Sequence, residues 1–274
     1  MRHNVASLRS TPGPAVGTDT VDLSLRVLEY LAGAAQPIGV SEIAREFDAS
    51  KATIYRHLQT LVHHGFVRQD AATMRYHAGI KLFILGERLR ERFDILHIAR
   101  DELMRLRDLT AQAVTLSALV DEQVVVLEVI QAPAIVNFGT QPGTVLDLHA
   151  SAHGKVALAF GPGELLSRCL ARPLRQWTAQ TITSHAALAR AVAQIRARGW
   201  TTAANQVLPG INGLAAPLFD HAGRYAGAIA VAGTVQAIPS APPAGLIEAV
   251  TRTAAQISRN LGFTAKWPRT SNGT

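Results

Sequence analysis

Hydrogen-bonding side chains gather around residue 50, in a segment that is poor in acidic residues. Between residues 50 and 77 the single acid is Asp70, and the bases are Lys51, Arg56, Arg68 and Arg75. Arginine and lysine donate to phosphate oxygens or to guanine, and hydroxyl and amide groups contact bases and backbone alike. The positions that could make such contacts are Ser50, Lys51, Thr53, Tyr55, Arg56 and Gln59. Arg56 suits a base edge or a phosphate, and Tyr55 and Thr53 suit bases or sugars.

A helix must hold these residues on one side, and the apolar spacing predicts it. Ile54, Leu58, Leu61 and Val62 recur at helical intervals after Lys51, which leaves the polar positions on the outer face. The preceding Ser50 is the expected N-cap and Gly65 the expected C-terminal cap. Ser50 and Lys51 therefore lie at the N-terminal end of the helix, where a phosphate is favoured.

Two more helices and a hairpin complete the pattern. Apolar spacing predicts helices over 21–31 and 41–47, and two short runs predict a β-hairpin over 66–78. This order is typical of a winged helix-turn-helix, which places its recognition helix in the DNA major groove. Ser41 is expected to donate to phosphate, and Arg75 on the wing to reach the flanking backbone or minor groove. The alternative is a winged helix that contacts protein and whose charges are only solvated.

The remainder predicts a second domain of α+β class with one central antiparallel sheet. Strand-like runs flank a turn at Asp121–Glu122, further strands are expected over 201–207, 213–220 and 225–233, and helices over 151–160, 184–199 and 245–261. We expect this organisation: flexible leader 1–18, winged helix-turn-helix 19–80, linker helix 81–110 (as one or two helices), second domain 111–264, and flexible tail 265–274. A stripe in the linker is expected to pack on a second subunit or on its own core: Leu82, Leu85, Leu89 and Phe93.

Composition sets outer bounds on these expectations. The 274 residues suffice for two domains, and the net charge of +7 is compatible with nucleic acid. The single cysteine, Cys169, excludes an intrachain disulfide and lies in an apolar helical run, so we expect it to pack in a core within a reducing cytoplasm. We find no apolar run long enough to span a bilayer and expect no membrane partner.

Motifs for catalysis and cofactors are missing from the sequence. It contains no Gly-x-Ser-x-Gly elbow, no His-Glu-x-x-His and no dinucleotide fingerprint, so we expect neither catalysis nor a cofactor. Scattered serines, histidines and aspartates leave open a triad assembled in space, as in an enzyme with an accessory winged helix. His149 and His153 are four residues apart and could share a metal, but no third ligand is obvious beyond the nearby Asp147, so we expect no metal.

Three stretches of the chain resemble the IclR family of transcriptional regulators. VSEIAREFDASKATIYRHLQTLVHHGFV resembles its DNA-binding domain, and LHASAHGKVALAF and PGINGLAAPLFDHAGRYAGAIAVAG resemble its effector domain. The resemblance spans about 21–261 and implies a GAF-like effector domain, homodimers or homotetramers, and pseudo-palindromic operators near catabolic genes. Two departures lie in the DNA-binding domain: Asp48 stands where many members have glycine, and Ala52 where many have serine or threonine.

Other departures lie where the resemblance implies an effector pocket. Gln206 replaces a common glutamate, and Gly213, Ala230 and Ala232 replace the cysteine or serine of members that bind very small acids. We expect the pocket to form from the helix start at 150–154, the loop 206–213 and the strand that carries Ala230. The expected lining is His149, Ser151, Ala152, His153, Gly154, Asn205, Gln206, Asn212, Gly213, Ala230 and Ala232.

Free N–H groups at the helix start suit a carboxylate, and the missing hydroxyls make the wall apolar. We therefore expect an organic acid larger and more apolar than glyoxylate or pyruvate, with aromatic acids among the candidates. The alternatives are that the small residues only pack in a tight sheet, or that the protein binds DNA without a ligand.

Overall fold

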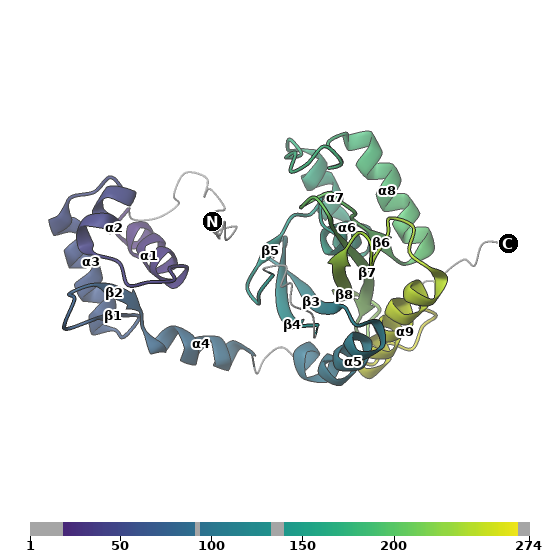
Figure 1. Ribbon diagram of the computed structural model, residues 1–274, viewed down its shortest axis with the longest axis horizontal. Helices are drawn as coiled ribbons and strands as arrows, with labels where there is room; N and C mark the ends of the chain where they lie inside the picture. Colours follow the sequence, from purple (N-terminus) through teal and green to yellow (C-terminus); the bar gives the residue numbers. More distant parts are fainter. Residues whose placement is uncertain (1–18, 91–93, 133–139, 268–274) are drawn as a thin grey trace. The chain divides into compact units, whose positions relative to one another are not determined.

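The computed structural model describes residues 19–90, 94–132 and 140–267, and the chain divides into two units, Met1–Phe93 and Asp94–Thr274 (Figure 1). The expected leader 1–18 lies outside the described residues, as does 268–274 of the expected tail. None of the helices in these described ranges is long and apolar enough to cross a membrane.

The first unit is a helix-turn-helix followed by a small hairpin and one further helix. Its core contains Val27, Leu31, Ile43, Ile54 and Leu58, of which Ile54 and Leu58 are positions that the helical spacing after Lys51 placed inward. The elements are α1 (Asp19–Ala32), α2 (Val40–Glu46), α3 (Lys51–His63), β1 (Val67–Gln69), β2 (Tyr76–Ala78) and α4 (Ile80–Arg90). The expected helix-turn-helix and hairpin are confirmed.

The turn between α2 and α3 needs a left-handed residue. Asp48 fills it with φ of 48°, a conformation that costs less for aspartate than for most side chains. The turn therefore keeps the tight geometry although it lacks glycine.

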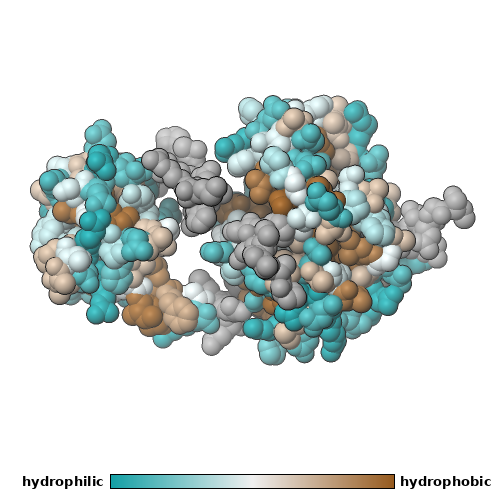
Figure 2. All heavy atoms as spheres, in the orientation of Figure 1, coloured by the Kyte–Doolittle hydropathy of each residue, from teal (hydrophilic) through white to brown (hydrophobic). Residues whose placement is uncertain are grey.

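Helix α4 leaves a large apolar surface uncovered in the described structure. Ile80 is 71% exposed, Phe83 64% and Ile84 43%. Hydrophobic residues gather over α4 in the lower left of Figure 2. Of the expected linker stripe, Leu85 is exposed and Leu82 half-buried, whereas Phe93 and the side chain of Leu89 lie outside the described part. This surface is available to another protein chain.

The second unit is built on one six-stranded antiparallel sheet with the order β5-β4-β3-β8-β7-β6, as the strand pattern predicted. Its strands are β3 (Ala113–Val120), β4 (Gln123–Ile130), β5 (Val145–Leu146), β6 (Thr201–Thr202), β7 (Ile211–Phe219) and β8 (Tyr225–Thr234). Its helices are α5 (Asp94–Thr110), α6 (Ala152–Phe160), α7 (Gly163–Leu170), α8 (His185–Arg198) and α9 (Ala244–Asn260).

Helices cover both faces of this sheet, so side chains alternate between two cores. On one face α5 and α9 pack against residues such as Leu116, Leu214 and Val231. On the other, α6 and its neighbours pack against small residues that include Ala215 and Ala230. The face covered by α6 is therefore lined by short side chains.

The structure revises two expectations about element bounds. Within 81–110 it has two helices, and Ala99, Leu103 and Leu106 of α5 are fully or almost fully buried in the core of the second unit. The second half of the expected linker is thus an integral part of that unit. The strand expected over 201–207 is only two residues long, because Asn205 turns the chain with φ of 59°.

Candidate functional site

The outer face of α3 carries the polar residues that the sequence singled out. Tyr55 is 51% exposed, and Lys51 and Arg56 are exposed as well. At the start of the helix the Ser50 hydroxyl accepts from the Thr53 amide at 3.1 Å and lies 2.9 Å from the Thr53 hydroxyl. These two hydroxyls cap the helix, and the exposed side chains of Lys51, Tyr55 and Arg56 are available to a ligand.

Other predicted contacts are placed differently around α3. Ser41 is exposed in the first turn of α2, whereas Gln59 is half-buried. Arg75 is already engaged within the protein: its guanidinium is 2.7 Å from a Glu42 carboxylate oxygen, and its Nε donates to the Pro37 carbonyl at 2.8 Å. Arg75 thereby ties the hairpin to the segment around α2.

A cation that the sequence reasoning did not select is exposed on the hairpin. Arg68 lies on β1 directly opposite His77 on β2, and its neighbour Val67 is buried. Because side chains alternate along a strand, Arg68 faces solvent. The sequence contained a signal for this: side chains alternate along the strand, so the apolar Val67 facing inward places Arg68 outward, which favours Arg68 over Arg75 as the wing cation.

In the second unit the start of α6 is held by a dense set of hydrogen bonds. The Ser151 hydroxyl accepts from the Gly154 amide at 2.9 Å and donates to the Asp147 carbonyl at 2.6 Å. The Asp147 carboxylate accepts the amides of His149 and Ala150. Most of the predicted free N–H groups are therefore used, and within the described part of the chain those of Ala152 and His153 (the first two helical residues) lack a protein acceptor.

Gly154 is required by close packing of the chain on itself. A Cβ at this position would lie 2.2 Å from the Asp147 carbonyl oxygen and 2.5 Å from the Leu148 Cα. Any side chain would push the 147–148 backbone away from the helix start.

Small residues on the sheet face the start of α6. A Cβ built on Gly213 would lie 3.7 Å from the Cβ of Ala152, which places these two residues face to face. In the antiparallel register Gly213 is opposite Ala232, and Ala230 is opposite Thr115, so these positions line the same face. The structure thus brings together three predicted elements, namely the α6 start, β7 and β8.

His153 links α6 to this face of the sheet. Its Nε2 is 2.7 Å from the Thr115 hydroxyl and its Nδ1 is 2.7 Å from the Ser117 hydroxyl. Complete burial lowers the pKa of His153 to about 4, so the ring is neutral at neutral pH. Neither hydroxyl partner was selected from the sequence, because both lie more than thirty residues from His153.

A buried amine of α6 bonds to the loop 203–210. Lys155 Nζ donates to the Gln206 side-chain oxygen at 2.7 Å and to the Thr202 carbonyl at 2.8 Å. Burial, with the nearby charge of Arg198, lowers the pKa of Lys155 to about 7. Asn205 holds the loop closed, since its side-chain oxygen accepts the Gly210 amide at 2.7 Å.

Two predicted pocket residues point elsewhere. Asn212 is buried and shares its face of β7 with Leu214, where its side chain bonds to the Ala203 amide and the Ile238 carbonyl. The His149 ring bonds to Asp147 and to the Arg175 carbonyl instead. These two side chains were predicted from proximity in sequence, which does not specify the face that each side chain occupies.

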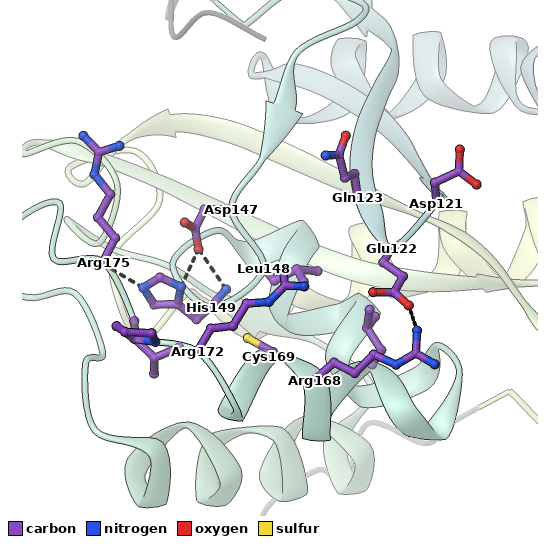
Figure 3. A pocket seen from close by; sticks show the side chains of 13 residues that line it. Asp121, Glu122, Gln123, Asp147, Leu148, His149, Arg168, Cys169, Arg172 and Arg175 are labelled. Carbon is purple, nitrogen blue, oxygen red and sulfur yellow. Dashed lines mark hydrogen bonds and ion pairs between the residues drawn. The ribbon is translucent and has the colours of Figure 1, made fainter. Parts of the chain in front are cut away.

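His149 and Asp147 form a close pair. His149 Nδ1 is 2.6 Å from an Asp147 carboxylate oxygen, and Nε2 is 2.8 Å from the Arg175 carbonyl oxygen (Figure 3). Burial alone would lower the pKa of His149, but the Asp147 hydrogen bond and charge raise it above its ordinary value. Both neighbours of the ring are acceptors, so the doubly protonated imidazolium satisfies both.

The two histidines do not form a metal site together, since their rings bond to different elements. Among the residues that the structure describes, no group of three or more histidine, cysteine or acidic side chains could hold a metal ion.

Comparisons with known proteins assign both units. Residues 20–71 match the IclR helix-turn-helix domain, and residues 88–259 match the bacterial transcriptional regulator IclR C-terminal domain. The chain is 32% identical over 243 residues to the HTH-type transcriptional regulator BhcR of Paracoccus denitrificans, covering 88% of this chain and 87% of that protein.

Solved structures agree with this assignment. The crystal structure of the Thermotoga maritima IclR matches with a TM-score of 0.73 and 28% identity, over 89% of this chain and 99% of that one. An IclR homolog of Microbacterium hydrocarbonoxydans, complexed with 4-hydroxybenzoate, shares the fold with a TM-score of 0.77 and 22% identity, over 88% and 98% of the two chains. This chain belongs to the IclR family of DNA-binding transcriptional regulators, which are not enzymes.

Proposed function

We propose that this regulator binds a pseudo-palindromic operator in the cytoplasm and controls catabolic genes in response to a small organic acid. The observation that carries the proposal is the face-to-face placement of the α6 start and the small residues of the sheet, in a chain whose α3 exposes Lys51, Tyr55 and Arg56. The α6 start and the small sheet residues bind the acid, and the exposed side chains of α3 bind the DNA.

For DNA binding, α3 is the recognition helix. Arg56 and Tyr55 read bases or adjacent sugars, and Lys51 at the N-terminal end of α3 contacts phosphate. The hydroxyls of Ser50, Thr53 and Ser41 and the amide of Gln59 remain additional contacts. Arg68, and not the expected Arg75, makes the wing contact, because Arg75 would have to leave Glu42 to reach DNA.

For effector binding, the acid lies between α6 and the sheet. Its carboxylate accepts the amides of Ala152 and His153 at the positive end of the helix, and its body lies against Gly213, Ala230 and Ala232. Because these three residues carry no polar side chain, the body is apolar and larger than that of glyoxylate or pyruvate. An aromatic acid such as 4-hydroxybenzoate, the ligand of the Microbacterium homolog, is the first compound to test.

Two copies of the chain are needed to read both halves of a palindrome. The exposed apolar face of α4, formed by Ile80, Phe83 and Ile84, supports a homodimer contact. A Phe83→Glu variant should weaken that contact, because a charge would be buried in it. Light scattering during size-exclusion chromatography should show a smaller assembly for Phe83→Glu than for the unaltered protein, and an unchanged mass would contradict the role of α4.

The experiment that tests the ligand response is operator binding by fluorescence anisotropy, at one fixed salt concentration because salt alone changes affinity steeply. We expect 4-hydroxybenzoate or a related aromatic acid to shift the operator affinity by about 5- to 150-fold, and pyruvate to have no effect. A Gly213→Val variant should retain operator binding and lose the response, since valine fills the space next to Ala152. A response to pyruvate alone, or a full response in Gly213→Val, would overturn the proposed pocket.

A further inference from the structure

A hollow on the second unit lies outside the proposed effector site. It has a volume of about 330 Å³ and lies between the β3–β4 turn, the segment 147–149, helix α7 and the segment that follows α7 (Figure 3). Ala152, Gly213 and Ala230, which face one another between α6 and the sheet, do not line it. The hollow is therefore a separate concavity.

Its walls combine an apolar surface with cationic side chains. Leu148, Leu165, Cys169 and Leu174 supply apolar atoms. Arg172 extends toward the middle of the hollow beside Leu148 (Figure 3). The lining thus joins a small apolar patch to several charged groups, and which of these charges is unpaired decides what the hollow can bind.

Most other charges around the hollow are already paired. Arg168 forms ion pairs with both Glu122 and Glu164. The Asp147 carboxylate is paired with His149 and also accepts from the Trp177 indole at 3.1 Å.

Two charged side chains of the lining remain. Arg175 stacks on the Trp177 ring, with its guanidinium carbon 3.9 Å from the ring centroid, and it extends away from the hollow in Figure 3. Asp121 lies in the β3–β4 turn, on the opposite side of the hollow from Arg175 in that view. Within the described ranges, no carboxylate lies within ion-pair distance of Arg172.

We propose that this hollow is a second ligand site, which binds a small monocarboxylate with an apolar or aromatic body. The Arg172 guanidinium takes the carboxylate through its two parallel N–H groups, a geometry that arginine provides and lysine does not. The body of the ligand covers Leu148, Leu165 and Leu174. This site does not depend on the proposed effector pocket and could be occupied at the same time.

The same segment borders both sites. His149 lies in the wall of the hollow, and the Asp147 carboxylate that holds His149 also accepts the amide of Ala150, two residues before α6 begins. An occupant of the hollow therefore touches the segment that precedes the N-terminus of α6.

Isothermal titration calorimetry with benzoate on the full chain tests this site. Arg172→Gln removes the charge from an exposed side chain, and Arg175→Gln is its matched control because that neighbour extends away from the hollow. Arg172→Gln loses a charge-assisted hydrogen-bonding group and should weaken benzoate binding to the hollow by at least about tenfold. Arg175→Gln should weaken the same binding by less than about twofold. Benzamide, which has the same ring without the charge, should bind neither variant nor the unaltered protein measurably.

A third variant separates the two sites. In Gly213→Val the Arg172-dependent binding of benzoate should persist unchanged, whereas any binding in the effector pocket is lost. The proposal is overturned if the unaltered protein does not bind benzoate at millimolar concentrations, if Arg172→Gln and Arg175→Gln, each combined with Gly213→Val, bind benzoate equally well, or if Gly213→Val abolishes all binding. The operator response to acids is measured in a separate experiment. A negative calorimetry result would therefore overturn the second ligand site without contradicting the proposed regulator function.

Discussion

Acidification should destabilise the second unit through one buried histidine. His153 is fully buried, and its two ring nitrogens each lie 2.7 Å from a hydroxyl, those of Thr115 and Ser117. A neutral ring satisfies both hydroxyls, because each hydroxyl can either donate or accept. A charged ring in the same place would lose its hydration without gaining an anion, which is why burial lowers the pKa of His153 to about 4.

The size of the effect follows from proton linkage. In the unfolded chain the pKa of histidine is about 6.5, so between that value and the folded value the unfolded state binds more protons. The free energy of unfolding therefore falls as the pH falls through this window. Between pH values of roughly 7 and 5, His153 should remove about 2 kcal/mol of stability.

Tryptophan fluorescence during guanidinium unfolding isolates this unit, because Trp177, Trp200 and Trp267 all lie within it. A His153→Gln variant keeps hydrogen-bonding groups at the site but does not titrate. The raised pKa of His149 gives the opposite trend, since stability from that group is present at low pH and is lost as pH rises. The contribution of His149 is the same in the unaltered protein and in His153→Gln. The difference between their free energies of unfolding therefore reports the titration of His153.

We expect the unaltered protein to lose about 2 kcal/mol more than His153→Gln over this pH range. Parallel stability curves for the two proteins would refute the reasoning, because they would show that His153 titrates in the folded state as it does in the unfolded chain.

Further substitutions test other parts of the account. Arg56→Ala should cost about 1–3 kcal/mol of operator binding by anisotropy if Arg56 reads a base, and unchanged affinity and specificity would remove it from the interface. Gly154→Ala should cost about 3 kcal/mol of stability in denaturant unfolding, because its Cβ would lie 2.2 Å from a backbone carbonyl oxygen; Gly213→Ala, with no atom nearer than 3.6 Å, is the control and should change little. Gln206→Glu should raise stability by about 1 kcal/mol near neutral pH by giving Lys155 a charged partner, and a fall in stability would show that the loop does not tolerate the buried charge.

Local signals predicted the elements well. Ser50 caps α3 through its hydroxyl, as its residue type indicated, and the helix expected over 184–199 is found with Ser184 as its N-cap and Gly199 at its left-handed end. The turn at Asp121–Glu122 joins β3 to β4 with positive φ at both residues. These features depend on a few neighbouring residues, so a single sequence is sufficient to predict them.

Long-range pairing could not be predicted in the same way. Arg75 was expected to reach DNA, but it bonds to Glu42, thirty-three residues away. Asn212 was grouped with Gly213, although neighbours in a strand point to opposite faces. The spacing of His149 and His153 left open a shared helix face, but α6 begins only at Ala152. The Arg75 pairing required a contact between distant segments to be known, and the other two expectations required the strand phase or the start of a helix to within one residue.

A footprint on the DNA upstream of the gene and its neighbours is the most direct test of the central claim, that this chain is a DNA-binding regulator with a ligand-responsive second unit. The account predicts protection of a pseudo-palindrome whose two halves lie on successive turns of the duplex, with the extent of protection changed by an aromatic acid. No protection up to micromolar protein, with or without the organic acids, would contradict it.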